Sequence, residues 1–344
     1  LVLHDATVST TVAGTSSGER GGSVGLTASQ LTMNGGVVEA ESTGASDAGN
    51  VIMDLGSLSA QGGSIVSRST SQATDAGAGG AIELSAMDII TLSGTEVLAT
   101  VLGGEQAGGD VTLTAPVIQL TNGTAIAAES EGAGTAGAIA IGDAGTESLR
   151  LQNSTVSTNA AEAKGGDINV QAQEIVYLTD SAITTSVGAG EGQGGNIFID
   201  PQYVILNRSR VQANAVGGPG GRIDIISDIY IKSADSIVEA KSDENIQGVV
   251  LITAPERDVV SGATVLPAEF QDPSRRLRAS CGQRVDVGRS NFQEVGLEGL
   301  PPSPDDYLWV TPLLPVAEAG GGLQSVVFFE PATTQFLVTP CGQN

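Results

Sequence analysis

The chain has 344 residues and a formal net charge of −24 at neutral pH, so it offers no basic face to nucleic acid or to anionic lipid headgroups. Hydrophobic residues make up 40% of the chain and its mean hydropathy is +0.11, which excludes a disordered acidic protein. No apolar run reaches the roughly 18 residues of a membrane-spanning helix, so insertion into a lipid bilayer is not expected.

A glycine-led pattern recurs nine times between Gly22 and Gly248, at intervals of 26–31 residues. The second residue after each glycine is always Val or Ile, and the fourth is always apolar. These repeat glycines are Gly22, Gly49, Gly80, Gly109, Gly137, Gly166, Gly195, Gly221 and Gly248. The residue between the two apolar positions is polar in several units, as with Glu83, Thr112 and Asn169, and this alternation is typical of a β-strand with one buried face.

Two more alternating pairs follow in the repeat units. Examples are the second pairs Ile118/Leu120, Val176/Leu178 and Ile229/Ile231, and the third pairs Ile126/Ala128, Val156/Thr158 and Ile183/Thr185. Each unit is therefore expected to hold three short strands and a turn rich in Gly, Ala and Ser. A β-sandwich is the alternative, but sandwiches do not repeat one three-strand pattern at a fixed period.

The sequence thus predicts an all-β protein. We expect a right-handed, single-stranded parallel β-helix of about nine to ten coils over residues 1–265, with about 28 residues and three strands per coil. Residues 1–10 match residues 176–185, which would be the second and third strands of a coil. The β-helix is therefore expected to begin in the middle of a coil, as a fragment of a longer repeat array.

The repeat stops near Leu266, and residues 266–344 differ in composition. They contain nine of the 13 prolines, seven of the eleven aromatic residues and both cysteines, Cys281 and Cys341. This composition predicts a small C-terminal cap over the last coil. In an exported protein the two cysteines are expected to form a disulfide, and two separately buried thiols are the alternative. His4 is the single histidine and lies at the other end, so no metal site or cofactor is expected.

Two stretches carry a resemblance to a known family. Residues 194–201 (GGNIFIDP) with 204–209 (VILNRS) resemble the filamentous haemagglutinin-type β-helix of two-partner secretion exoproteins. The tail is similar to the C-terminal region of large exoproteins from cyanobacteria and related Gram-negative bacteria, on the motif residues Gly299, Leu300, Pro301, Pro302 and Pro304. Glu298 stands where the usual residue is basic, which argues against a role that depends on charge.

The resemblance implies export through an outer-membrane transporter of the two-partner type, which would be a partner of the protein. It also implies a location outside the cell or on the outer surface of a Gram-negative bacterium. Glycans or the surface of a host or neighbouring cell are further candidate partners.

Polar side chains directly after the repeat glycines are the candidate site. Asp167, Asn196 and Arg222 occupy this position on three consecutive coils and would form a polar ladder, for which a solvated strand face is the alternative interpretation. A single histidine leaves Ser/His/Asp and Cys/His catalysis without a base. The glycine-rich turns are interpreted as needing positive φ, and the turns at 103–108 and 188–193 are candidate contact surfaces.

These observations favour a non-catalytic structural or adhesive segment of an exported surface protein, in which a stiff rod and its turns make weak multivalent contacts. Two alternatives remain open. One is a β-helical polysaccharide lyase or hydrolase. The other is a C-terminal anchor that holds the exoprotein at its outer-membrane transporter.

Overall fold

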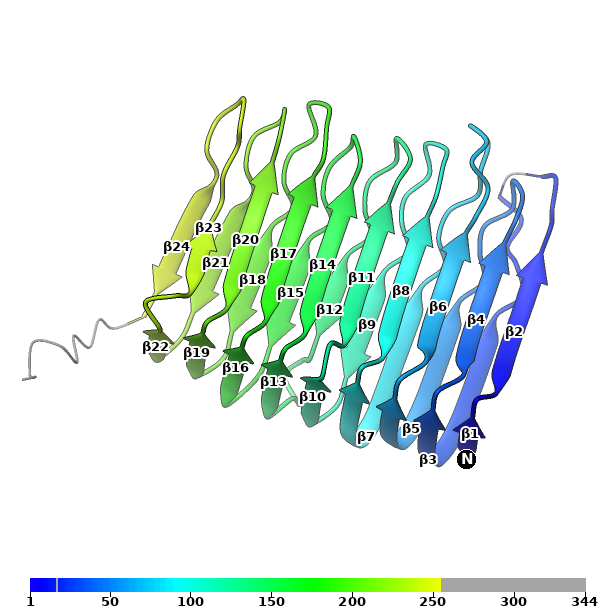
Figure 1. Ribbon diagram of the computed structural model, residues 1–344, viewed down its shortest axis with the longest axis horizontal. Coiled ribbons are helices and arrows are strands. Elements are labelled where there is room, and N and C mark those ends of the chain that lie inside the picture. The colour runs from blue at the N-terminus through cyan, green and yellow to red at the C-terminus, as the bar shows by residue number, and fades with distance from the viewer. Residues whose placement is uncertain (17, 255–344) are drawn as a thin grey trace, which may run out of the picture. The chain divides into compact units, whose positions relative to one another are not determined.

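The structure is a computed structural model that describes residues 1–16 and 18–254. This part of the chain is all-β, and its strands are parallel and stacked in coils, so the predicted parallel β-helix is confirmed. Figure 1 shows the chain rising along the front strands, crossing to the back and descending as it advances from the N-terminal end, which is a right-handed path.

The strands form three columns. The third strands of the coils make a nine-stranded sheet. Its members are β2 (Thr7–Val12), β4 (Val37–Ser42), β6 (Ser64–Ser69), β8 (Glu96–Val101), β11 (Ala125–Ser130), β14 (Thr155–Ala160), β17 (Ala182–Val187), β20 (Arg210–Ala215) and β23 (Ile237–Glu239). The first and second strands belong to one 15-stranded sheet that bends around the rest of the coil.

Three long strands join the two columns of that sheet. They are β3 (Val24–Asn34), β5 (Val51–Gln61) and β7 (Ile82–Ser93). The first column then continues as β9 (Val111–Thr114), β12 (Ile139–Ile141), β15 (Ile168–Gln171), β18 (Ile197–Asp200), β21 (Arg222–Ile226) and β24 (Val249–Thr253). The second column consists of β1 (Val2–His4), β10 (Val117–Thr121), β13 (Ser148–Gln152), β16 (Ile175–Thr179), β19 (Tyr203–Asn207) and β22 (Ile229–Lys232).

The prediction of three short strands is therefore wrong for the coils of β3, β5 and β7, where the first two strands are continuous. In the later coils a corner separates them. Pro116 interrupts the chain between β9 and β10, and Pro201 does so between β18 and β19. A proline has no N–H to donate to a strand ladder, so the strand ends there and the chain turns.

The core is a set of stacked apolar ladders. Val111, Ile139, Ile168 and Ile197 pair in register from coil to coil and are at most 1% exposed. These are residues that the glycine-led pattern placed inward. Each buried Val or Ile side chain contributes roughly 1.5–3 kcal/mol relative to an exposed one, so the ladder is a main source of stability.

The second strand of the last complete coil departs from the predicted pattern. Ile229 and Ile231 were expected to point inward, but Tyr230 and Lys232 pair with the buried Val204 and Leu206 instead. Ile231 is 50% exposed. The alternation is ambiguous here because Ile, Tyr and Ile follow one another, and a shift of one residue exchanges the two faces.

The repeat glycines stand where the backbones of successive coils are in close contact. A Cβ atom added at any of the eight from Gly49 to Gly248 would lie 1.8–2.1 Å from the carbonyl oxygen of the repeat glycine one coil earlier. None of these glycines has a positive φ. Close approach of the backbone, and not a left-handed conformation, therefore requires glycine at this position.

Gly109→Ala tests this requirement. The new Cβ would lie 2.0 Å from the Gly80 carbonyl oxygen, so the coils would have to separate, and we expect a loss of about 3 kcal/mol or more in unfolding free energy. Gly25→Ala is the matched control, because no atom lies within 4 Å of its added Cβ. It should leave stability unchanged or raise it by up to about 1 kcal/mol. Urea denaturation measures both, and equal midpoints would contradict the packing role.

Tyr230→Phe tests the exchanged register of β22. The Tyr230 hydroxyl is buried without a hydrogen-bond partner in the described part of the chain, and burial raises the pKa of the phenol to about 12. A pKa raised on folding means that stability falls as the pH rises from about 10 to 12. Removing an unpaired hydroxyl should leave stability at pH 7 equal or higher. The Phe variant should also lose part of the alkaline decline, and a decline of unchanged size would contradict the buried placement.

Several predictions lie outside the described residues. These are the boundary at residue 265, the cap over 266–344, the Cys281–Cys341 disulfide and the tail motif. They stay predictions.

Candidate functional site

The structure brings the predicted polar ladder together. Asp167, Asn196 and Arg222 lie on consecutive coils, each at the start of its first strand. Asp167 Oδ1 accepts hydrogen bonds from the Asn196 backbone N–H at 2.8 Å and from its Nδ2 at 3.0 Å. Asn196 Oδ1 accepts from the Arg222 backbone N–H at 3.1 Å. The ladder therefore links backbone groups of adjacent coils.

The same link occurs in coils that were not part of the predicted trio. Ser23 Oγ accepts from the Asn50 N–H, Asn50 Oδ1 from the Ala81 N–H and Asp110 Oδ1 from the Ala138 N–H. Arg222 instead turns to Asp224, whose carboxylate oxygen lies 2.6 Å from Nε, and this hydrogen bond raises the pKa of the guanidinium. The polar ladder is thus a row of caps that satisfies strand-starting N–H groups, and its carboxylate is already engaged.

Asp167→Ala tests the capping role. The variant leaves the Asn196 N–H without its acceptor, and we expect a loss of about 1 kcal/mol in unfolding free energy. Asp167→Asn keeps an acceptor oxygen and should stay within about 0.5 kcal/mol of the parent protein. Chemical denaturation compares the three proteins, and an Ala variant as stable as the parent would show that the cap is dispensable.

The predicted contact turns lie at another corner, where the third strand leads into the next coil. Residues 103–108 follow β8 and residues 188–193 follow β17. The turns stack through backbone hydrogen bonds such as Ala189 N–H to Ala161 O at 2.7 Å. Positive φ explains only some of their glycines, Gly104 and Gly190 among them. At others, such as Gly103 and Gly192, an added Cβ would collide with the backbone of the preceding coil. The interpretation of these turns by φ alone is therefore wrong.

A third corner, between the second and third strands, carries the best-formed ion pair. Arg208 donates from Nε and from a terminal nitrogen to the two Asp180 carboxylate oxygens, at 2.7 Å each. Both residues have positive φ, 50° and 47°. The guanidinium lowers the pKa of Asp180 through this hydrogen bond. The pair joins two coils at a strained turn, and each partner satisfies the other.

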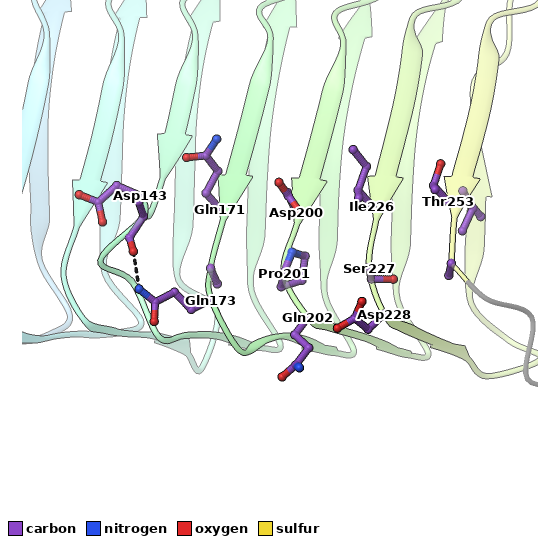
Figure 2. A pocket seen from close by; sticks show the side chains of 14 residues that line it. Asp143, Gln171, Gln173, Asp200, Pro201, Gln202, Ile226, Ser227, Asp228 and Thr253 are labelled. Carbon is purple, nitrogen blue, oxygen red and sulfur yellow. Dashed lines mark hydrogen bonds between the residues drawn. The ribbon is translucent and has the colours of Figure 1, made fainter.

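A groove lies at the remaining corner, between the first and second strands. It has a volume of about 1080 Å³ and runs across five consecutive coils (Figure 2). Its walls are Asp143–Ala144, Gln171–Gln173, Asp200–Gln202, Ile226–Asp228 and Ile252–Ala254. We call this set the corner groove. Four coil spacings of about 4.8 Å make it roughly 19 Å long.

The corner groove presents carboxylate and amide groups that the fold does not use. Asp200, Gln202 and Asp228 are exposed, and their side chains make no hydrogen bond within the described residues. Gln173 is held by a hydrogen bond from Nε2 to the Ala144 carbonyl. In Figure 2, Gln171, Asp200, Ile226 and Thr253 lie in one row on successive coils, whereas Gln202 points away from that row on the other side of the corner. Such a row can accept and donate hydrogen bonds at regular intervals.

An apolar surface adjoins the corner groove on the second strands. Ile175, Tyr203 and Ile229 pair in register, as do Tyr177, Ile205 and Ile231 beside them. These six residues face away from the buried core positions of β16, β19 and β22. At the corresponding positions, earlier coils hold both apolar residues (Ile89 and Val117) and polar ones (Gln119, Ser148 and Arg150). The exposed Tyr203 and Ile231 lie on the coils that also line the groove.

No cluster of three or more His, Cys, Asp or Glu side chains among the described residues could hold a metal ion. Within the same residues no helix is long and apolar enough to cross a membrane.

Comparison with known protein families, curated proteins and solved structures gave no match.

Sequence reasoning placed the candidate site at the start of the first strand and missed the corner groove at its end. A signal was present, because Gln171, Gln173, Asp200, Gln202 and Asp228 all fall in the short gaps between the first and second apolar pairs. It was hard to detect because the gaps differ in length between coils. The polar residues therefore stand at different distances from the repeat glycine, and their common position is seen only once the strands are aligned.

Proposed function

We propose that the chain is a stiff, non-catalytic adhesive segment of an exported surface protein, of the filamentous haemagglutinin type that its sequence resembles. It acts by holding rows of weakly binding side chains along a rod. The transporter-mediated export and the location on the cell surface come from the resemblance and belong to this proposal.

The observation that carries the proposal is that one set of polar side chains caps backbone N–H groups between coils, while another set is exposed in the corner groove. Asp110 and Asp167, the carboxylates nearest the repeat glycines, are used as caps between coils. The unengaged groups instead lie in a row along the rod. Repeated weak contacts at fixed spacing suit a multivalent ligand, for which avidity replaces single-site affinity.

The test is retention of polysaccharides on beads that carry the protein at low and at high density. We expect retention that rises steeply with density and no new chain ends in solution. Density-dependent retention is the signature of avidity, whereas a tight single site would retain the polymer equally per molecule. A protein of similar net charge that has no β-helix, bound to the same beads, controls for nonspecific retention.

Two outcomes would contradict the proposal. New chain ends would identify a polysaccharide lyase or hydrolase. Absence of retention at both densities would remove the adhesive role. The anchoring alternative concerns Cys281 and Cys341, which lie outside the described residues.

A further inference from the structure

We propose that the corner groove binds a linear polysaccharide without acid groups, which lies along the axis of the β-helix. This inference rests on the proposed adhesive function and names the ligand class and the site.

The shape of the groove favours a polymer. It crosses five coils, and each coil contributes the same corner, so similar positions recur at about 4.8 Å over roughly 19 Å. A compact ligand would meet several equivalent positions and no unique one. A chain of sugar residues can occupy successive positions at once.

The side chains of the groove favour hydroxyl groups as partners. Carboxylates at Asp200 and Asp228 accept hydrogen bonds, and the amide of Gln202 both donates and accepts. All three are exposed and make no hydrogen bond within the described residues. Polar side chains of the capping rows, in contrast, are engaged by backbone N–H groups. The groove therefore keeps a hydrogen-bonding capacity that a polyhydroxylated ligand would use.

Ser227 adds a buried hydroxyl to the groove that the described residues do not engage. It lines the groove, is only 8% exposed, and its hydroxyl has no hydrogen-bond partner in the described part of the chain. Figure 2 shows the hydroxyl directed along the groove toward the coil of Thr253. A buried hydroxyl without a partner is costly, and a ligand hydroxyl or a water held by the ligand would remove that cost.

Charge selects against acidic polymers. Among the described residues, the groove is lined by Asp143, Asp200 and Asp228 and by no Lys or Arg side chain. Uronic acid or sulfate groups would meet these carboxylates at short range, where like charges repel. A neutral or amine-bearing chain avoids this repulsion.

Tyr203 supplies an apolar contact at the edge of the groove. It follows Gln202 directly, is 37% exposed, and lies between Ile175 and Ile229 in the paired strands. The carbon-bearing face of a sugar ring is apolar and flat, and an exposed tyrosine ring is a suitable surface for it. Hydrogen-bonding groups and an aromatic ring thus adjoin each other.

The test is calorimetric titration of the full chain with three series of defined oligosaccharides: a neutral glucan, a glucosamine polymer and a uronate polymer. We expect binding to the first two that strengthens with chain length until the groove is filled, and at least about tenfold weaker binding to the uronate series. Gln202→Ala combined with Tyr203→Ala should weaken binding about tenfold. Gln152→Ala, an exposed glutamine on β13 outside the groove, is the matched control and should bind like the parent protein.

The charge argument has a separate test. Asp200→Asn combined with Asp228→Asn should keep binding to the neutral series and improve binding to the uronate series several-fold. Both side chains are exposed, so folding should be preserved, and thermal denaturation checks this.

Three results would overturn the inference. If the groove variants bind as the parent protein does while polymers are still retained on beads, the adhesive function stands and the groove is the wrong site. Preferred binding of the uronate series would contradict the ligand class. If no series binds and no polymer is retained on the beads, the inference and the adhesive function fail together. New chain ends accompanied by loss of binding in the variants would contradict only the non-catalytic function.

Discussion

The contact between repeat glycines of successive coils is the constraint on which the β-helix depends. A side chain at this position would meet the carbonyl oxygen of the preceding coil at about 2 Å, so no other residue allows the coils to stack at strand spacing. The contact lies just before the first strand, and it therefore sets the axial position at which each strand begins. Once the glycines are aligned, the Val and Ile residues two positions later fall into register without further adjustment.

Tight stacking leaves little room for water, and many interior polar groups are satisfied by neighbouring coils. Core hydroxyls do this at the glycine row, where Thr158 donates to the Gly166 carbonyl at 2.7 Å and Thr185 donates to the Gly195 carbonyl at 2.9 Å. A row of buried serines does it at another corner, where the Ser181 N–H donates to the Ser209 Oγ at 3.2 Å. These side chains resemble catalytic residue types, yet their positions in the ladders explain them as structural.

The sequence predicts the fold well because the inward-pointing residues lie at fixed distances, two and four positions, after each repeat glycine. Ile139 and Ile168 are recognisable from their distance to Gly137 and Gly166 alone. Prediction from these distances fails where two alternations fit the same residues, or where the gap between the first and second strands changes length from coil to coil. The run Ile229-Tyr230-Ile231 supports two registers, and only pairing with Val204 and Leu206 selects one. In the same way, Asp167 and Asn196 were identified as neighbours, but their role became clear only from the N–H groups that they accept.

The corner groove lies in coils whose first and second strands are separate. In β5 and β7 the chain passes from the first to the second column as one strand, with a register shift at Leu55 and Ser57 that bends it. The later coils use separate strands, and the residues between them no longer have to alternate inward and outward. Polar side chains such as Asp200 and Gln202 can therefore project from the corner without disturbing a ladder. Backbone hydrogen bonds between coils continue through the corner, for example from the Gln202 N–H to the Gln173 carbonyl at 3.2 Å. The corner is therefore a stable part of the coil surface from which side chains can project.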